Sequence, residues 1–327
     1  MSNPLLNSNK LPPFSSIQPE HIQPAVEQGI ANCRQKIEEV LKHQGQFTWD
    51  NLIAPLEEVD DELGKIWSPI SHMNSVVSSE EWRQAHDACL PLLSEYGTFV
   101  GQHQGLYQAY KSLAESAEFA TYSQAKKKLI ENSLRDFELS GIGLSDDDKL
   151  RYGELVKRMS ELTSSFSNQL LDATQAWSKL ITDEAELKGL PESAVAAAAA
   201  MAAAKEQQGW LFTLDFPSYL PVMTYSENRE LREECYRAFV TRASDQGPNA
   251  GEFDNGPLMD EILALRHELA NLLGFDSFAD KSLATKMAET PNQVLAFLTE
   301  LAARSKSQGE TELKEIKEFA ATEYGAT

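Results

Sequence analysis

The sequence predicts a mostly α-helical protein with one small β-hairpin. Over most of the chain apolar residues recur every three or four positions, the pattern of a helix with one buried face. Strict alternation of apolar and polar residues, which is typical of a half-buried strand, is confined to the stretch 210–216. Hydrophobic residues make up 42% of the 327 residues, enough for a packed core. The chain is therefore expected to fold as a large multi-helix assembly.

A first helical region is expected over residues 1–144. One helix is predicted over 22–41 and a second over 52–66, because the apolar residues of each segment fall on a single face. Ser78 followed by Glu81 has the spacing of a capping box and should open a further helix. The region is predicted to be a set of packed helices without strands.

The second region, 145–327, should begin with one long helix. Ser145 precedes three aspartates, and both a hydroxyl cap and negative charge stabilise a helix N-terminus. From Leu155 to Trp177 the apolar residues repeat at a spacing close to that of a coiled-coil seam. This helix is expected to pack along a partner over most of its length.

The only β signal follows that helix. The alternating stretch 210–216 is predicted to pair with 222–225 across a proline-containing turn, which gives a hairpin over about 210–225. Helices are expected to resume over 258–273 and, from the cap at Thr290, over nearly all the remaining sequence.

Charge and cysteine content limit the possible partners and location. Lys and Arg total 29 against 50 Asp and Glu, a formal net charge of −21 that argues against nucleic acid and anionic membranes as partners. The same balance is compatible with cationic or zwitterionic peptides, and it is also usual for soluble cytoplasmic proteins. No signal peptide or bilayer-spanning apolar run is found. Three cysteines far apart argue against a disulfide framework, so a cytoplasmic location is expected.

The first candidate chemistry is hydrolysis by a zinc-bound water. A His-Glu-x-x-His helix places two imidazoles on one zinc ion and a glutamate beside the bound water. The nearest approach runs from His267 to Asn271, where an amide stands in place of the second histidine. A neutral amide is a poor zinc ligand. His267 is therefore expected to be an ordinary helix residue, and no metal ligand is predicted in this chain.

Two other candidates are equally incomplete. His86 and Cys89 would share a helix face, but a catalytic thiol also needs a group that orients the base and an oxyanion site, and a cysteine on an apolar stripe is usually a packing residue. The Gly141–Gly143 pair lacks the rest of a phosphate-binding loop, and acidic residues follow it. Lys126–Lys128 is interpreted as a solvated helix face. No catalytic residue is predicted, and the substrate-binding residues remain unknown at this stage.

Longer stretches carry a family resemblance. The runs Phe216–Met223, Arg229–Phe239 and Ile262–Phe275 resemble the thimet-oligopeptidase family of zinc metallopeptidases, as do Ala279–Asp280 and Ser282–Met287. The similarity extends over essentially the whole chain. Members of this family are about twice as long and carry His-Glu-x-x-His and a further glutamate ligand in their C-terminal half.

The resemblance implies a function for this chain as part of such an enzyme. It implies half of an ellipsoidal, channel-containing metalloendopeptidase of peptide degradation, with zinc in the complete enzyme and none bound by these residues. The expected partners are short peptides and the C-terminal catalytic half, which would supply the glutamate that activates a zinc-bound water. The isolated chain is expected to be inactive. The alternative is a non-enzymatic helical module that binds peptides or a partner chain.

Overall fold

The computed structural model describes residues 3–6 and 11–325. This part of the chain contains twelve α-helices, several short 3-10 or π turns and one two-stranded antiparallel sheet. The predicted class, mostly α with a small β element, is confirmed. The chain divides into two compact units, Met1–Leu265 and Arg266–Thr327. The boundary expected between residues 144 and 145 stays a prediction.

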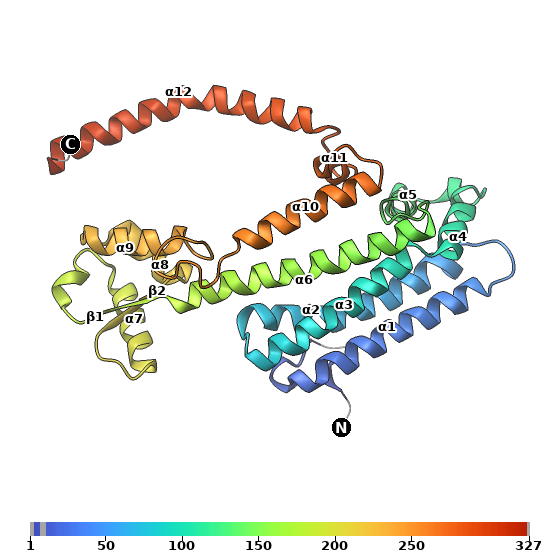
Figure 1. The fold of residues 1–327 in the computed structure, drawn as a ribbon, viewed down its shortest axis with the longest axis horizontal. Helices are drawn as coiled ribbons and strands as arrows, with labels where there is room; N and C mark the ends of the chain where they lie inside the picture. Colours follow the sequence, from blue (N-terminus) through green and yellow to red (C-terminus); the bar gives the residue numbers. More distant parts are fainter. Residues whose placement is uncertain (1–2, 7–10, 326–327) are drawn as a thin grey trace. The chain divides into compact units, whose positions relative to one another are not determined.

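Five helices form the N-terminal bundle of the first unit (Figure 1). They are α1 (Pro19–Leu41), α2 (Ala54–Val76), α3 (Glu80–Gly101), α4 (Gln104–Ala114) and α5 (Gln124–Leu139). Helix α1 packs on both α2 and α3, and α4 packs on α5. Pro19 stands at the first position of α1, where a missing N–H costs no hydrogen bond, and Val26 and Cys33 are fully buried on its inner face. The helices predicted over 22–41 and 52–66 are thus confirmed, and the second is longer than expected.

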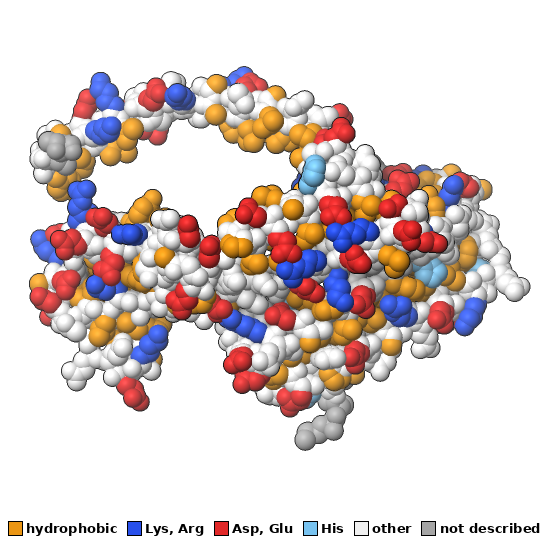
Figure 2. All heavy atoms as spheres, in the orientation of Figure 1, with side chains coloured by type: hydrophobic (Ala, Val, Ile, Leu, Met, Phe, Trp, Pro, Cys, Tyr) orange, Lys and Arg blue, Asp and Glu red, His pale blue; other side chains and the backbone are white. Residues whose placement is uncertain are grey.

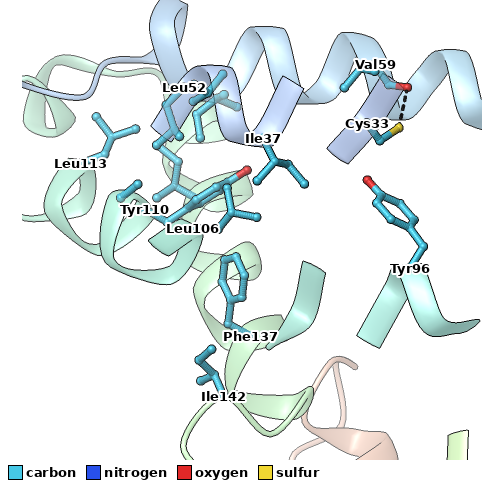
Figure 3. Packing of buried hydrophobic residues seen from close by; sticks show 14 of the residues in the cluster. Cys33, Ile37, Leu52, Val59, Tyr96, Leu106, Tyr110, Leu113, Phe137 and Ile142 are labelled. Carbon is cyan, nitrogen blue, oxygen red and sulfur yellow. Dashed lines mark hydrogen bonds between the residues drawn. The ribbon is translucent and has the colours of Figure 1, made fainter. Parts of the chain in front are cut away.

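The core of this bundle is apolar with a few polar atoms paired inside it (Figure 3). Leu113 and Ile130 are completely buried. The Cys33 thiol donates a hydrogen bond to the Val59 carbonyl at 3.4 Å, and the Tyr96 hydroxyl points toward the same sulfur (Figure 3). Burial raises the pKa of Cys33, so the group remains a neutral thiol that ties α1 to α2.

Helix α6 (Asp146–Ala176) is the long helix predicted after Ser145. The Ser145 hydroxyl accepts a hydrogen bond from the Asp148 N–H at 3.2 Å, which confirms the predicted cap. Helix α6 lies along α3 (Figure 1), as its apolar seam predicted. Arg83 on α3 donates two hydrogen bonds to the Asp172 carboxylate on α6, at 2.7 and 2.5 Å, and this bidentate pair fixes the two helices against each other.

The predicted hairpin is wrong in its second strand. Strand β2 (Trp210–Thr213) pairs antiparallel with β1 (Ser178–Ile181), which directly follows α6, and α7 (Glu192–Ala204) lies between the two strands in sequence. Residues 222–225 instead end α8 (Phe216–Tyr225). A proline in the first turn of α8 suits a helix start. Val222 is completely buried on that helix, so its apolar character reflects helix packing and not a strand.

The remaining elements complete the two units. Helix α9 (Arg229–Val240) shares a core with β2, α7 and α8, and α10 (Gly256–Leu272) continues across the division between the units. The second unit adds α11 (Phe278–Leu283) and α12 (Pro291–Tyr324). The Thr290 hydroxyl accepts from the Gln293 N–H at 3.2 Å, which confirms the predicted cap. None of the described helices combines the length and the apolar character needed to span a bilayer.

Candidate functional site

In the segment that comes nearest to a zinc motif, the two relevant side chains contact each other. His267 and Asn271 are both exposed on α10, one turn apart, and the Asn271 side-chain nitrogen lies 2.9 Å from Nε2 of His267. Over residues 3–6 and 11–325, no three His, Cys, Asp or Glu side chains converge closely enough to hold a metal ion. The side chains described here therefore do not fit a hydrolytic zinc ion, which needs several converging donors.

The second candidate pair, on α3, does not form a thiol nucleophile. The Cys89 thiol is fully buried and donates to the Ala85 carbonyl at 3.3 Å. Burial raises the pKa of Cys89 to about 11, so little thiolate forms near neutral pH. The His86 ring stacks on Trp67, with the ring centroids 4.8 Å apart, and its Nδ1 lies 2.9 Å from the Asp87 carboxylate. The imidazole therefore faces a carboxylate and not the sulfur.

A groove of about 840 Å³ lies in the first unit between α2 and α6, and α3 contributes the buried His86. Seven of its fifteen lining residues carry a hydroxyl group, two carry an amide, and none carries a carboxylate, an ammonium or a guanidinium group. The hydroxyl residues are Ser68, Ser71, Ser75, Ser160, Thr163, Ser164 and Ser167. In a chain with 24% charged residues, an uncharged polar groove of this size is a distinct chemical surface.

Some of these hydroxyl groups already have partners. Ser164 donates to Asp87 at 2.9 Å, and Thr163 and Ser75 donate to backbone carbonyls of their own helices at 2.7 Å. Burial alone would raise the pKa of Asp87, but hydrogen bonds from His86 and Ser164 lower it overall. Asp87 is thus an anion with a 44% exposed side chain, held beside the groove by Ser164 and His86.

No sequence motif marks this groove. The lining residues of α2 and those of α6 are more than eighty positions apart in the sequence, and they match no motif. The one available signal was the spacing of serines on each helix, three or four residues apart, which places them on a single face.

A second surface, in the second unit, is apolar. Helix α12 has no buried residue among those described, and hydrophobic side chains gather along one side of it (Figure 2). Its exposed large apolar residues are Leu295, Phe297, Leu298, Leu301, Leu313, Ile316, Phe319 and Tyr324. Contiguous exposed apolar surface of this kind marks an interaction site.

Comparison with known proteins gives the class of protein to which this helical architecture belongs. Residues 26–149 match the family described as Neurolysin/Thimet oligopeptidase, N-terminal domain, and residues 222–327 match Peptidase family M3. The chain belongs to peptidase family M3.

Individual relatives cover the whole chain. It is 64% identical over 327 residues to oligopeptidase A of Haemophilus influenzae, 61% identical over 325 residues to oligopeptidase A of Salmonella typhimurium, and 36% identical over 332 residues to a probable cytosolic oligopeptidase A of Arabidopsis thaliana. These alignments cover 99–100% of this chain but only 46–48% of each relative. The chain thus spans about half the length of the curated relatives it matches and corresponds to their N-terminal portion.

Proposed function

We propose that these residues form the non-catalytic N-terminal portion of a zinc metallo-oligopeptidase that hydrolyses short peptides. The carrying observation is the 64% identity over the full chain to an oligopeptidase A of about twice the length. A zinc ion in that enzyme would be held by residues outside this chain, since the described side chains do not fit it. The role of this portion is to shape the channel in which substrate lies.

The apolar side of α12 supports this assignment. Eight large apolar side chains on one helix are each more than half exposed. Their exposure to water is unfavourable unless another part of the protein covers them. The remainder of a longer M3 peptidase is a natural cover for them, because permanent interfaces resemble a divided hydrophobic core. The three described cysteines form no disulfide, which supports a cytoplasmic location.

A chimaera tests the proposal directly. The 327 residues are joined to the part of the H. influenzae oligopeptidase A that lies beyond the aligned region, and cleavage of a fluorogenic peptide is measured. We expect activity that a chelator removes and zinc restores. The matched control is the H. influenzae part expressed without these residues. A folded, zinc-loaded chimaera that cleaves no peptide would contradict the proposal.

The chain by itself is the second arm of the test. We expect no stoichiometric zinc and no peptidase activity from the 327 residues alone. Chelator-sensitive cleavage by this chain would refute the assignment of a non-catalytic role. The alternative, a non-enzymatic binding module, requires instead that the chimaera be inactive and that the chain bind peptides or a partner unaided.

A further inference from the structure

We infer that the groove between α2 and α6 binds uncharged, polar stretches of peptide in an extended conformation. The inference rests on the proposed peptidase function, and it names the kind of substrate segment that this surface takes. It is carried by the spacing, the hydrogen-bonding capacity and the lack of charge of the lining residues.

The spacing of the hydroxyl residues matches an extended chain. Ser68, Ser71 and Ser75 form one stripe along α2, and Ser160 and Ser167 begin and end a second stripe along α6. The first and last serine of each stripe are seven positions apart, about 10 Å at a rise of about 1.5 Å per residue. An extended peptide advances about 3.3 Å per residue, so about three peptide residues cover the same length. The two rows of hydroxyls line one groove, and each is as long as a short extended peptide segment.

Much of the hydrogen-bonding capacity of the groove is not taken up by other groups of the described chain and is open to a ligand. Among the described residues, the hydroxyls of Ser68, Ser71, Ser160 and Ser167 make no hydrogen bond. The Asn74 side-chain oxygen is buried and has no partner in the same part of the chain. A hydroxyl group donates and accepts, and an extended backbone offers both N–H and C=O groups at each residue. A peptide would satisfy these groups without a fixed side-chain sequence.

The lack of charge sets the specificity. A lysine or aspartate side chain placed in the groove would lose water without gaining an opposite charge, and that desolvation is costly. The carboxylate of Asp87, which does not line the groove, is already engaged by Ser164 and His86. Trp67 and Met159 add apolar surface for one uncharged side chain. The groove therefore favours neutral segments although the protein as a whole is strongly acidic.

The remainder of a longer chain is a less suitable occupant. Permanent interfaces are apolar and closely packed, whereas nine of the fifteen lining residues here are hydroxyl- or amide-bearing. The apolar side of α12 has the composition that a permanent cover requires. A polar, uncharged groove is better suited to a ligand that binds reversibly than to a permanent interface.

Isothermal titration calorimetry on the full 327-residue chain tests the inference. The probe is a capped heptapeptide of Gly, Ser and Asn with one central Tyr, and two matched peptides each replace two residues with Asp or with Lys. Salt is kept at physiological strength, where the Debye length is about 8 Å, to suppress long-range attraction by the acidic surface. We expect the neutral peptide to bind and both charged peptides to bind about tenfold more weakly.

Paired variants locate the binding. Ser167→Trp fills the groove from α6, and Ser71→Trp fills it from α2, while Ser165→Trp places the same side chain on an exposed α6 position outside the groove. We expect the first two to weaken binding of the neutral peptide about tenfold or more and the third to leave it unchanged. Circular dichroism checks that each variant is folded, and two filling variants on different helices keep the test decisive if one unfolds.

Several results would overturn the inference: no binding of the neutral peptide, equal binding of the charged peptides, or equal effects of all three variants. Calorimetry needs no catalysis. A failure here therefore leaves the chimaera assay of the proposed function standing, and an inactive chimaera leaves the calorimetric result standing.

Discussion

The closest approach of α1 and α2 gives a sharp prediction about packing. Gly29 on α1 is completely covered by α2: a Cβ at this position would lie 2.8 Å from Cδ1 of Leu63 and 3.0 Å from Cδ1 of Ile66. Gly64 lies on α2 as well, but nothing is within 4 Å of a Cβ placed there. Both glycines are inside helices, so the change Gly→Ala has the same intrinsic effect at each position.

The magnitudes follow from two opposing terms. Alanine is favoured over glycine in a helix interior by about 0.8–1 kcal/mol, and Gly64→Ala should raise the free energy of unfolding by about that amount. At Gly29 the same gain is opposed by overpacking against the terminal methyl groups of two buried side chains, which can rotate away, so the cost lies near the lower end of about 1–3 kcal/mol. We expect Gly29→Ala to leave the free energy of unfolding nearly unchanged, a difference of about 1 kcal/mol from Gly64→Ala.

Urea denaturation followed by far-ultraviolet circular dichroism measures both variants. The two sites lie in one helix bundle. The urea concentrations at the midpoints can therefore be compared directly if the dependence of the free energy of unfolding on urea concentration is the same for both variants. The midpoint is expected to rise for Gly64→Ala and to stay nearly unchanged for Gly29→Ala. A Gly29→Ala protein as stable as Gly64→Ala would refute the argument, because it would mean that α1 and α2 are not held at this spacing.

Three further predictions concern groups that are already paired or buried. Burial raises the pKa of Cys235 to about 12, and all three cysteines are buried. Ellman's reagent should therefore detect no fast-reacting thiol in the folded protein at pH 8 and three thiols after unfolding. A rapid reaction of the folded protein would contradict this. Asp172→Asn removes the ionic partner of Arg83, whose side chain is 22% exposed. In urea denaturation it should lower the free energy of unfolding by about 1–2 kcal/mol, and by less at high salt. An unchanged midpoint would show that the pair does not hold α3 to α6. The pKa of Asp87 is lowered in the folded state, so its contribution to stability is present above about pH 4 and is lost as the pH falls through the folded pKa. Asp87→Asn should therefore flatten the acid side of a stability-versus-pH curve, and an identical curve would exclude the contribution.

Local signals predicted the helices well and the pairing of strands poorly. Long amphipathic segments such as α6 were found because the periodic pattern and the N-cap agree. The capping box at Ser78 was displaced by one residue: the helix begins after Ser79, whose hydroxyl accepts from the Trp82 N–H, while the Ser78 hydroxyl accepts from Arg83. Two adjacent serines offer two possible caps, and the sequence pattern alone does not distinguish them.

Strand pairing depends on contacts that a local pattern does not contain. The alternation that marked β2 was real, but its partner β1 precedes it by nearly thirty residues and is only four residues long. A nearer apolar segment, 222–225, offered an apparent partner, yet burial among helices accounts for it. The groove escaped prediction for the same reason, since Ser71 and Ser167 become neighbours of one hollow only through the packing of α2 and α6 on α3.

The two exposed surfaces of this chain have opposite chemistry, and that contrast bears on how a longer peptidase would use them. Apolar side chains on α12 gain free energy whenever water is removed, so a cover that stays in place is favoured. Hydroxyl groups in the groove exchange hydrogen bonds with water for hydrogen bonds with a ligand, and the net gain of each exchange is small. Such a surface can hold a peptide segment without trapping it. An enzyme that must release products requires the second kind of surface along its substrate path and the first kind between its permanent parts.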